Sequence, residues 1–161
     1  AAFDNLARFA LAEIGNIHSD ALDFEPIYRV MFNVDVNDVL VNIDKYFATE
    51  SPNSKIKYVY GNKEGSIDIN IPSDKVSTGV IQDFIDDYLS KNKNAKVDYI
   101  HGVEDVVTLA RKNNSIGFLY EGISKDTLFE SVSNTGALPR KTFSMGEARD
   151  KRYYLECRKI K

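Results

Sequence analysis

The sequence predicts an α/β fold, with α+β as the alternative, in which a mixed β-sheet is flanked by about four helices. Two observations lead to this prediction. Segments rich in β-branched and aromatic residues alternate with segments of helical period along the 161 residues. Two strands at 55–60 and 66–71 are close enough to form an antiparallel hairpin, so the sheet should contain antiparallel as well as parallel pairs. The length favours a single domain over residues 1–161.

The expected strands differ in their pattern of burial. Residues 7–17 are almost continuously apolar, which is typical of a strand that is buried on both faces. In residues 66–71, isoleucine alternates with polar residues, which indicates a strand with one face in water. The residues from Asn62 to Gly65 are expected to form the hairpin turn. The expected strands comprise residues 7–17, 27–34, 55–60, 66–71, 96–100, 115–120 and 153–160.

Four segments have the apolar period of an amphipathic helix. Asp35 precedes the first and Ser124 precedes the last, and both residue types accept hydrogen bonds from the free amides of a first helical turn. Gly136 is placed as the C-terminal glycine of the last helix. The expected helices cover residues 36–47, a stretch that begins at 77 or 78, residues 103–112 and a stretch between 124 and 136.

The composition is that of an ordinary globular protein, with 43% hydrophobic and 28% charged residues. No apolar run approaches the roughly 18 residues that a membrane-spanning helix needs, so no membrane partner is expected. The single cysteine, Cys157, excludes an internal disulfide bond, and we expect a reducing, cytoplasmic location. Since the chain does not start with Met, we expect it to be a fragment of a longer protein.

The charge is unevenly distributed. The whole chain has a net charge of −3, yet residues 137–161 carry eight Lys and Arg against three acids. This asymmetry suggests an anionic partner for the C-terminal end. The alternative is a basic strand edge in water, which protects a sheet from aggregation.

The loop before the last expected strand is the first candidate site. It combines Pro139, Arg140, Lys141, Thr142 and Ser144. The proline stiffens the loop, the two cations can bind a phosphate or a carboxylate, and the hydroxyls can donate hydrogen bonds. Donors that are fixed before a ligand arrives favour anion binding. The alternative is a basic loop exposed to solvent.

Two further positions are candidates. His101 and Gly102 stand where a strand ends and a helix begins, a place where open α/β sheets collect ligands, so they are expected to line a substrate pocket. Arg29 stands in the middle of an apolar strand and is either a surface residue with a buried stem or a positioned cation.

Several types of site are excluded by their missing motifs. The chain lacks the glycine-rich fingerprints G-x-G-x-x-G and G-x-x-x-x-G-K-[ST], and it lacks H-E-x-x-H and G-x-S-x-G. Its two histidines cannot form a three-histidine metal site, and Asp83, Asp86 and Asp87 are spaced to lie on the solvent side of a helix. We therefore expect no metal site in this chain, and its residues identify no catalytic group.

The chain resembles the C-terminal part of the domain of unknown function 1015 family, which is sometimes described as ParB-like and of which some members are free-serine kinases. The residues that carry the resemblance are Phe9–Ile14, Phe24–Val30, Asp98–Gly102, Ile116–Leu119 and Gly136–Gly146. It implies that Arg29, Arg140, Lys141 and Thr142 lie near a phosphate-handling cleft. The kinases tend to have Pro-Lys-Ser-Thr where this chain has Arg140-Lys141-Thr142, so the ligand can differ.

The resemblance also implies what lies outside this chain. Full-length members are longer, and their upstream half supplies acidic catalytic residues. On this basis we expect the C-terminal half of a small-molecule phosphotransferase, similar to an L-serine kinase, that is inactive by itself. Nucleotide or pyrophosphate with Mg²⁺ would be the cofactor of the full-length protein, and the partners would be its N-terminal half and a small anionic ligand.

Two alternatives remain open at the level of the sequence. A structural module would dock its basic strand on the missing half, or on a second copy in a homodimer. A nucleic-acid-binding module would use the basic segment 140–161, but the sequence pI of about 5.4 disfavours it, because nucleic-acid-binding domains are usually basic.

Overall fold

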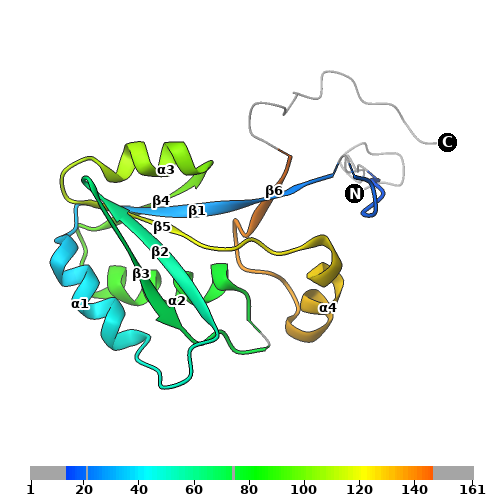
Figure 1. Cartoon of the computed structure of the whole chain (residues 1–161), viewed down its shortest axis with the longest axis horizontal. Helices are drawn as coiled ribbons and strands as arrows, with labels where there is room; N and C mark the ends of the chain where they lie inside the picture. Colours follow the sequence, from blue (N-terminus) through cyan, green and yellow to red (C-terminus); the bar gives the residue numbers. More distant parts are fainter. Residues whose placement is uncertain (1–13, 21, 74, 147–161) are drawn as a thin grey trace, which may run out of the picture.

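The computed structural model describes residues 14–20, 22–73 and 75–146. Figure 1 shows the resulting arrangement of one sheet and its helices. The strands are β1 (Phe24–Phe32), β2 (Ser54–Tyr60), β3 (Lys63–Ile69), β4 (Lys96–His101), β5 (Ser115–Leu119) and β6 (Phe143–Met145). The helices are α1 (Val36–Tyr46), α2 (Ser77–Lys91), α3 (Val103–Ala110) and α4 (Lys125–Thr135). The predicted class, a sheet flanked by four helices and including one hairpin, is confirmed.

The sheet has the strand order β3-β2-β5-β1-β4, and β6 pairs with the first residues of β1. Every pairing between the described strands is antiparallel, so the parallel pairs expected of a mixed sheet are not found there and the α+β alternative describes the fold better. β4 and β5 both run antiparallel to β1, so β1 separates two strands that run in the same direction. The connection through α3 therefore crosses over β1 instead of joining neighbours.

Helices cover both faces of the sheet. In Figure 1, α3 lies on one side and α1 with α2 on the other. We call the side of Arg29 and Met31 the helix-pair face, because Met31 packs into one cluster with buried residues of α1 and α2. We call the side of Tyr28 and Val30 the α3 face, because Val30 pairs with Gly117, which lies against Val106 of α3. The larger core lies under the helix pair.

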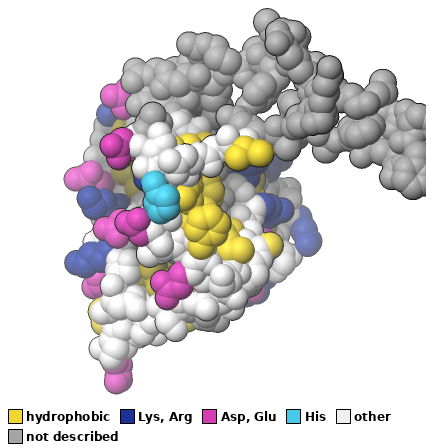
Figure 2. Space-filling view, turned by 90° about the vertical axis from the view of Figure 1, so that its right-hand side faces the viewer, with side chains coloured by type: hydrophobic (Ala, Val, Ile, Leu, Met, Phe, Trp, Pro, Cys, Tyr) yellow, Lys and Arg dark blue, Asp and Glu magenta, His cyan; other side chains and the backbone are white. Residues whose placement is uncertain are grey.

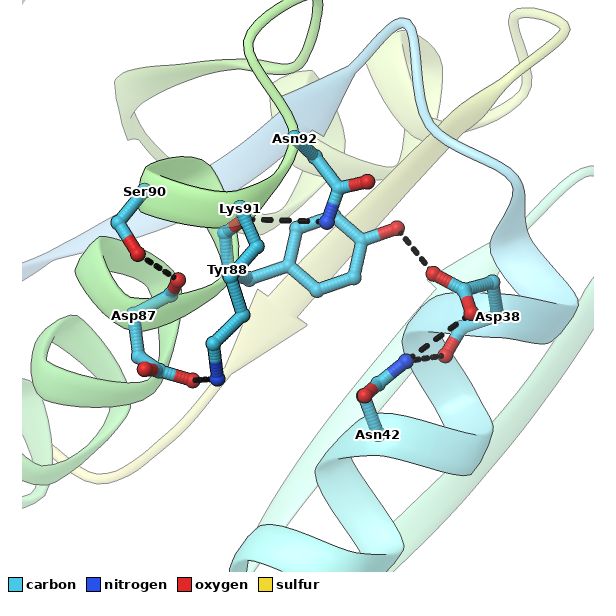
Figure 3. Close-up of polar contacts among 7 residues, drawn as sticks. All are labelled: Asp38, Asn42, Asp87, Tyr88, Ser90, Lys91 and Asn92. Atoms are coloured by element: carbon cyan, nitrogen blue, oxygen red, sulfur yellow. Dashed lines mark hydrogen bonds and ion pairs between the residues drawn. The ribbon is translucent and has the colours of Figure 1, made fainter.

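The two helices of the pair are connected by a buried tyrosine. Tyr88 of α2 is 4% exposed, and its hydroxyl donates a hydrogen bond of 2.7 Å to a carboxylate oxygen of Asp38 on α1. Figure 3 shows this side chain pointing from α2 to the first turn of α1. Burial, and then the bond to Asp38, raise the pKa of Tyr88 well above its ordinary value. The tyrosine therefore stays a neutral donor across the physiological range.

The predicted helix ends agree closely with the structure. Asp35 accepts hydrogen bonds from the amides of Asn37 and Asp38, and Ser124 accepts one from the amide of Thr127. Gly136 ends α4 with a φ of 79°, a conformation that costs little only for glycine. These short-range signals depend on the local sequence alone, which is why they were visible in it.

The hairpin turn lies earlier than predicted. Tyr60 pairs with Lys63, so the turn consists of Gly61 and Asn62, and the predicted turn residue Gly65 lies inside β3 opposite Tyr58. A β-carbon at Gly65 would come within 2.3 Å of the Tyr58 hydroxyl. Gly65 is therefore needed because the tyrosine ring lies over it, and not because the chain turns there.

Two sequence predictions meet the limits of the described residues. The strand predicted at 7–17 lies outside them up to residue 13, and residues 14–17 form no strand. The strand predicted at 153–160 lies outside them entirely. By contrast, β6 was not predicted as a strand, because its three residues are too few for a periodic pattern.

Candidate anion-binding site

Arg29 is the centre of the candidate site. It is fully buried, at 0% exposure, on the helix-pair face of β1. Its Nη2 donates to the carbonyl oxygen of Arg140 at 2.9 Å, and its Nη1 donates to that of Lys141 at 2.8 Å. Nη1 also contacts the Tyr120 hydroxyl at 3.0 Å and the Ile27 carbonyl oxygen. The guanidinium therefore joins the middle of β1 to a loop that is more than a hundred residues away in the chain.

The remaining contacts of Arg29 come from α2 and β4. Its Nε donates to Oε1 of Gln82 at 3.1 Å, and its guanidinium carbon lies 4.8 Å from the centre of the Tyr99 ring. All of these partners are neutral, and no ion pair joins Arg29 to a carboxylate of the described part of the chain. The positive charge is therefore solvated by protein dipoles and an aromatic ring.

The turn from Pro139 to Thr142 is held in an unusual conformation, and we call it the basic turn. Lys141 has a φ of 57°, in the left-handed region that glycine normally fills. The Thr142 hydroxyl donates to the Pro139 carbonyl at 2.6 Å and closes the turn. Since Arg29 binds two carbonyl oxygens of the same turn, the backbone is fixed from inside while the Arg140 and Lys141 side chains lie at the surface.

Arg140 lies at the surface but has a partner. Its Nη2 is 3.2 Å from Oδ1 of Asp86, and the two side chains are 64% and 52% exposed. The same carboxylate oxygen accepts a hydrogen bond of 2.9 Å from Gln82, which also binds Arg29. The guanidinium carbon of Arg140 lies 5.8 Å from the Tyr99 ring. Asp86, Gln82 and Tyr99 thus connect the buried arginine to the exposed one.

The strand register places the other predicted residues on the same face. His101 is opposite Ile27, and Ser144 is opposite Glu25, and both partners share the face of Arg29 because side chains alternate along β1. Ser144 is 6% exposed, and its hydroxyl has no hydrogen-bond partner within the described residues. Arg29, His101, the basic turn and Ser144 are therefore gathered at one end of the helix-pair face.

Gly102 plays a structural part at this end of the sheet. It has a φ of 79° and stands as the N-cap of α3, where no side chain caps the helix. A residue with a β-carbon would be strained in this conformation. Its glycine identity is thus explained by the bend between β4 and α3, so a role in ligand binding is not needed to account for it.

Tyr120 supports the buried arginine from the other side. Its hydroxyl donates to the Ile27 carbonyl at 2.6 Å while it accepts from Arg29. Burial raises the pKa of Tyr120 to about 12, although the charge and the hydrogen bond of Arg29 act in the opposite direction. The phenol is therefore neutral at neutral pH and can donate this hydrogen bond.

The geometry changes the role that the sequence suggested for Arg29. We expected its guanidinium to contact an anion, but most of its donors are bound to oxygen atoms of the protein. Its observed role is to position the basic turn. Arg140, Lys141 and their surroundings remain the groups that a ligand could reach.

The sequence did not identify Gln82, Asp86, Tyr99 or Tyr120 as part of this site. Gln82 and Asp86 are four residues apart, so they lie on one side of a helix, but only the fold shows which side meets Arg29. Asp83 and Asp87 were expected to face solvent, and they form exposed ion pairs with Lys75 and Lys91. In the part of the chain that the structure describes, no group of His, Cys, Asp and Glu could hold a metal ion.

Comparison with known proteins gives a fold relationship and no family. No protein-family model and no curated protein matches the chain. A solved structure of a conserved hypothetical protein from Pyrococcus furiosus is similar, with a TM-score of 0.62 and 16% identity over 84% of this chain. The match spans 61% of that protein, so the chain covers less than two thirds of its length. Within the described residues, no helix has the length and apolar character needed to cross a membrane.

Proposed function

We propose that this chain is the C-terminal half of a small-molecule phosphotransferase-like protein and supplies a cationic wall for a phosphate group. The observation that carries the proposal is the clamp of Arg29 on the carbonyl oxygens of Arg140 and Lys141. Three cations meet there, and Asp86 is the one carboxylate that forms an ion pair with any of them among the described residues. Such a wall would stabilise the charge of a phosphoryl group during its transfer.

The basic turn has the rigidity that this function needs. Cations that are already in place when a ligand arrives lose little entropy on binding and stabilise charge more effectively than mobile ones. Arg29 fixes the turn through hydrogen bonds to its backbone, which leaves both exposed side chains available. The left-handed conformation of Lys141 costs roughly 1 kcal/mol, and local strain of this kind is common at functional sites.

The ion pair between Arg140 and Asp86 does not prevent ligand binding. Both side chains are more than half exposed, and exposed ion pairs contribute at most about 1 kcal/mol. A phosphate offers a planar guanidinium two oxygen atoms and more negative charge than one carboxylate. We therefore expect Arg140 to exchange Asp86 for a phosphate, with Lys141 as a second charge beside it.

The test is a calorimetric titration of the protein at its full natural length with pyrophosphate, phosphoserine and ADP, each with and without Mg²⁺. We expect saturable binding of at least one of them, weakened roughly tenfold by Arg140→Gln and by Lys141→Gly. Lys141→Gly removes the charge and also relieves the left-handed backbone, so it should not unfold the turn.

Two control variants separate charge from backbone effects. Asn114→Gly relieves the same left-handed conformation, with a φ of 58°, at a distant turn and removes no charge. Lys112→Gln removes an exposed charge elsewhere. If none of the three ligands binds, or if Arg140→Gln and Lys141→Gly bind them as well as the controls do, the phosphotransferase proposal is wrong.

One observation favours a second candidate, a module that docks on a protein partner. The end of the molecule that carries α4 and β6 exposes Phe129, Val132 and Met145, at 65%, 40% and 58%. Figure 2 faces this end and shows apolar side chains exposed there, bordered by charged ones. Exposed apolar side chains that lie together can mark an interaction surface. Self-association that Phe129→Ser abolishes, together with no phosphate binding, would favour this candidate.

A further inference from the structure

The α3 face contains a cleft that lies apart from the basic turn. α3 packs over one end of this face, where Val106 and Ala110 lie against Gly117. A cleft of about 840 Å³ lies on this face of the sheet, next to the N-terminal end of α3. Its lining includes two half-buried residues of β1, one residue of β5 and the first residue of α3: Pro26, Tyr28, Leu119 and Val103. The charged residues of the lining are Lys55, Lys57, Asp68 and Glu121.

The strand register gives the floor of the cleft a definite order. Lys57 of β2 lies opposite Leu119 of β5. Since Arg29 pairs with Phe118, the next residues along the two strands, Tyr28 and Leu119, are neighbours on the α3 face. The floor therefore runs from an ammonium group, across a leucine, to a tyrosine. An apolar surface thus lies between a cation and an aromatic ring.

The two lysines of the cleft differ in their partners. Lys55 forms an ion pair of 3.4 Å with Asp68. Lys57 points to the same face, two residues further along β2, and no carboxylate among the described residues lies within ion-pair distance of it. Glu121 also lines the cleft, and with Asp68 it balances the two lysines in number. The positive charge of Lys57 is therefore a local one, at its own end of the apolar floor.

The opposite wall supplies aromatic surface. The Tyr28 ring packs edge to face against Tyr120, with ring centres 5.6 Å apart, which fixes its orientation. Val103 is 48% exposed at the rim although it begins an amphipathic helix. An exposed valine beside a half-buried leucine and a half-buried proline is an apolar surface that a ligand could cover.

We propose that this cleft binds a small organic anion with an aromatic or aliphatic body, whose acidic group lies at Lys57 and whose body lies on Leu119, Tyr28 and Val103. The volume is within the range of small-molecule sites, which combine an apolar lining with a few polar groups that set orientation. The positive charge at one end selects an anion over a neutral molecule of the same shape. This site is on the opposite face of the sheet from Arg29, so it does not depend on the phosphotransferase proposal.

The test uses two fluorescent probes that share one body. 8-Anilinonaphthalene-1-sulfonate carries an acidic group, and N-phenyl-1-naphthylamine has the same ring system without it. We expect the sulfonate to bind about tenfold more tightly than the neutral probe to the full chain. Lys57→Gln should remove this difference, with the affinity for the neutral probe unchanged. Val103→Asp should weaken both probes, because it places a charge at the apolar rim.

Lys96→Gln is the matched control, since Lys96 is an exposed lysine of β4 that does not line the cleft. It should bind both probes as the parent does. Equal binding of the two probes by the parent, or a preference for the sulfonate that persists in Lys57→Gln, would overturn the proposal. Far-ultraviolet circular dichroism of each variant confirms that the compared proteins are folded.

A second copy of the chain is the other occupant that the cleft could take. Sedimentation velocity of the parent and of Val103→Asp shows whether a second copy occupies the cleft. A monomer in both cases supports a small-molecule site. A dimer that Val103→Asp converts to a monomer shows that the cleft is an interface between copies, and the small-anion proposal is then wrong.

Discussion

Arg29 is the residue on which the candidate site depends. An arginine in the interior is expensive unless its donors are satisfied, and here the carbonyl oxygens of Ile27, Arg140 and Lys141 satisfy several of them. The planar guanidinium reaches these oxygens in different directions at once, which a lysine ammonium cannot do. Its burial is therefore a sign that it organises the basic turn.

We predict that Arg29→Lys lowers the free energy of unfolding by on the order of 3 kcal/mol, because it leaves buried carbonyl oxygens without donors. Urea unfolding followed by circular dichroism measures this change. Arg111→Lys, at an exposed arginine after α3, is the control and should change stability by less than about 0.5 kcal/mol. A loss at Arg29 no larger than that of the control would contradict the structural role of this residue.

Two tyrosines make the protein sensitive to alkali. The pKa of Tyr120 is raised to about 12, and that of Tyr88 is also raised, in both cases mainly by burial. A folded-state pKa above the unfolded value of about 10 means that the stabilisation is complete below pH 10 and is lost as the pH rises through the folded pKa.

We therefore predict that the free energy of unfolding falls between about pH 10 and pH 12, by up to about 1.4 kcal/mol per pH unit for each tyrosine. Urea unfolding at several pH values in this window gives the slope. Tyr46→Phe, at a tyrosine that is 46% exposed, should leave the slope unchanged, whereas Tyr120→Phe should reduce it. A flat profile over this window would show that neither buried phenol is linked to unfolding.

At the scale of elements, α3 depends on a glycine of the strand beneath it. A β-carbon at Gly117 would lie 2.6 Å from Cγ1 of Val106 and 3.4 Å from the Ala110 β-carbon. Both are buried residues of α3, so neither can move aside without moving the helix. Gly117 thus sets how closely α3 approaches β5, and through α3 it sets the position of Val103 at the rim of the cleft.

Gly117→Ala should consequently lower the free energy of unfolding by about 1–3 kcal/mol, through overpacking between β5 and α3. Hydrogen exchange should increase most strongly in the amides of α3. Gly15→Ala is the control, because no atom of the described residues lies within 4 Å of the β-carbon that it adds. An unchanged stability with unchanged exchange in α3 would mean that the helix adjusts without cost.

The basic turn and the cleft are organised by different elements. The turn depends on β1, α2 and β4, which meet through Arg29, Gln82 and Tyr99. The cleft depends on β2, β5 and the start of α3. Since β1 passes between the two faces with alternating side chains, one strand contributes Arg29 to the first site and Tyr28 to the second. A substitution at one site therefore need not disturb the other.

At the scale of the whole molecule, anion binding should appear as added stability. A ligand that binds only the folded state adds about 1.4 kcal/mol at ten times its dissociation constant. We predict that the ligand identified by calorimetry raises the midpoint of thermal unfolding of the parent, and raises it less in Lys141→Gly. An equal rise of the unfolding midpoint in both proteins would show that the ligand binds at a site other than the basic turn.

The acidic character of the chain as a whole also bears on its partners. A net charge of −3 repels polyanions at long range, while the small anion that we propose would be attracted by the basic turn at short range. This combination fits a small phosphate better than a nucleic acid.

Features that depend on neighbouring residues could be predicted from the sequence. The caps Asp35 and Ser124 and the terminating Gly136 each act within a few residues, so their hydrogen bonds and dihedral angles followed from local chemistry. The sequence also predicted the class of fold, because apolar periodicity distinguishes helices from strands. Their unusual residue types marked Arg29 and the basic turn as separate candidates, and only the family resemblance suggested that they belong to one site.

The tertiary structure alone decided how these parts meet. The pairing of β1 with β4 and β5 joins segments about seventy and ninety residues apart, and no local pattern encodes such partners. The same holds for Gly65, which the sequence suggested as a turn residue and which the fold places under the Tyr58 ring. Above all, the sequence could not show that the Arg29 guanidinium binds the backbone of the turn, because that depends on which oxygens the folded chain brings within reach of a buried cation.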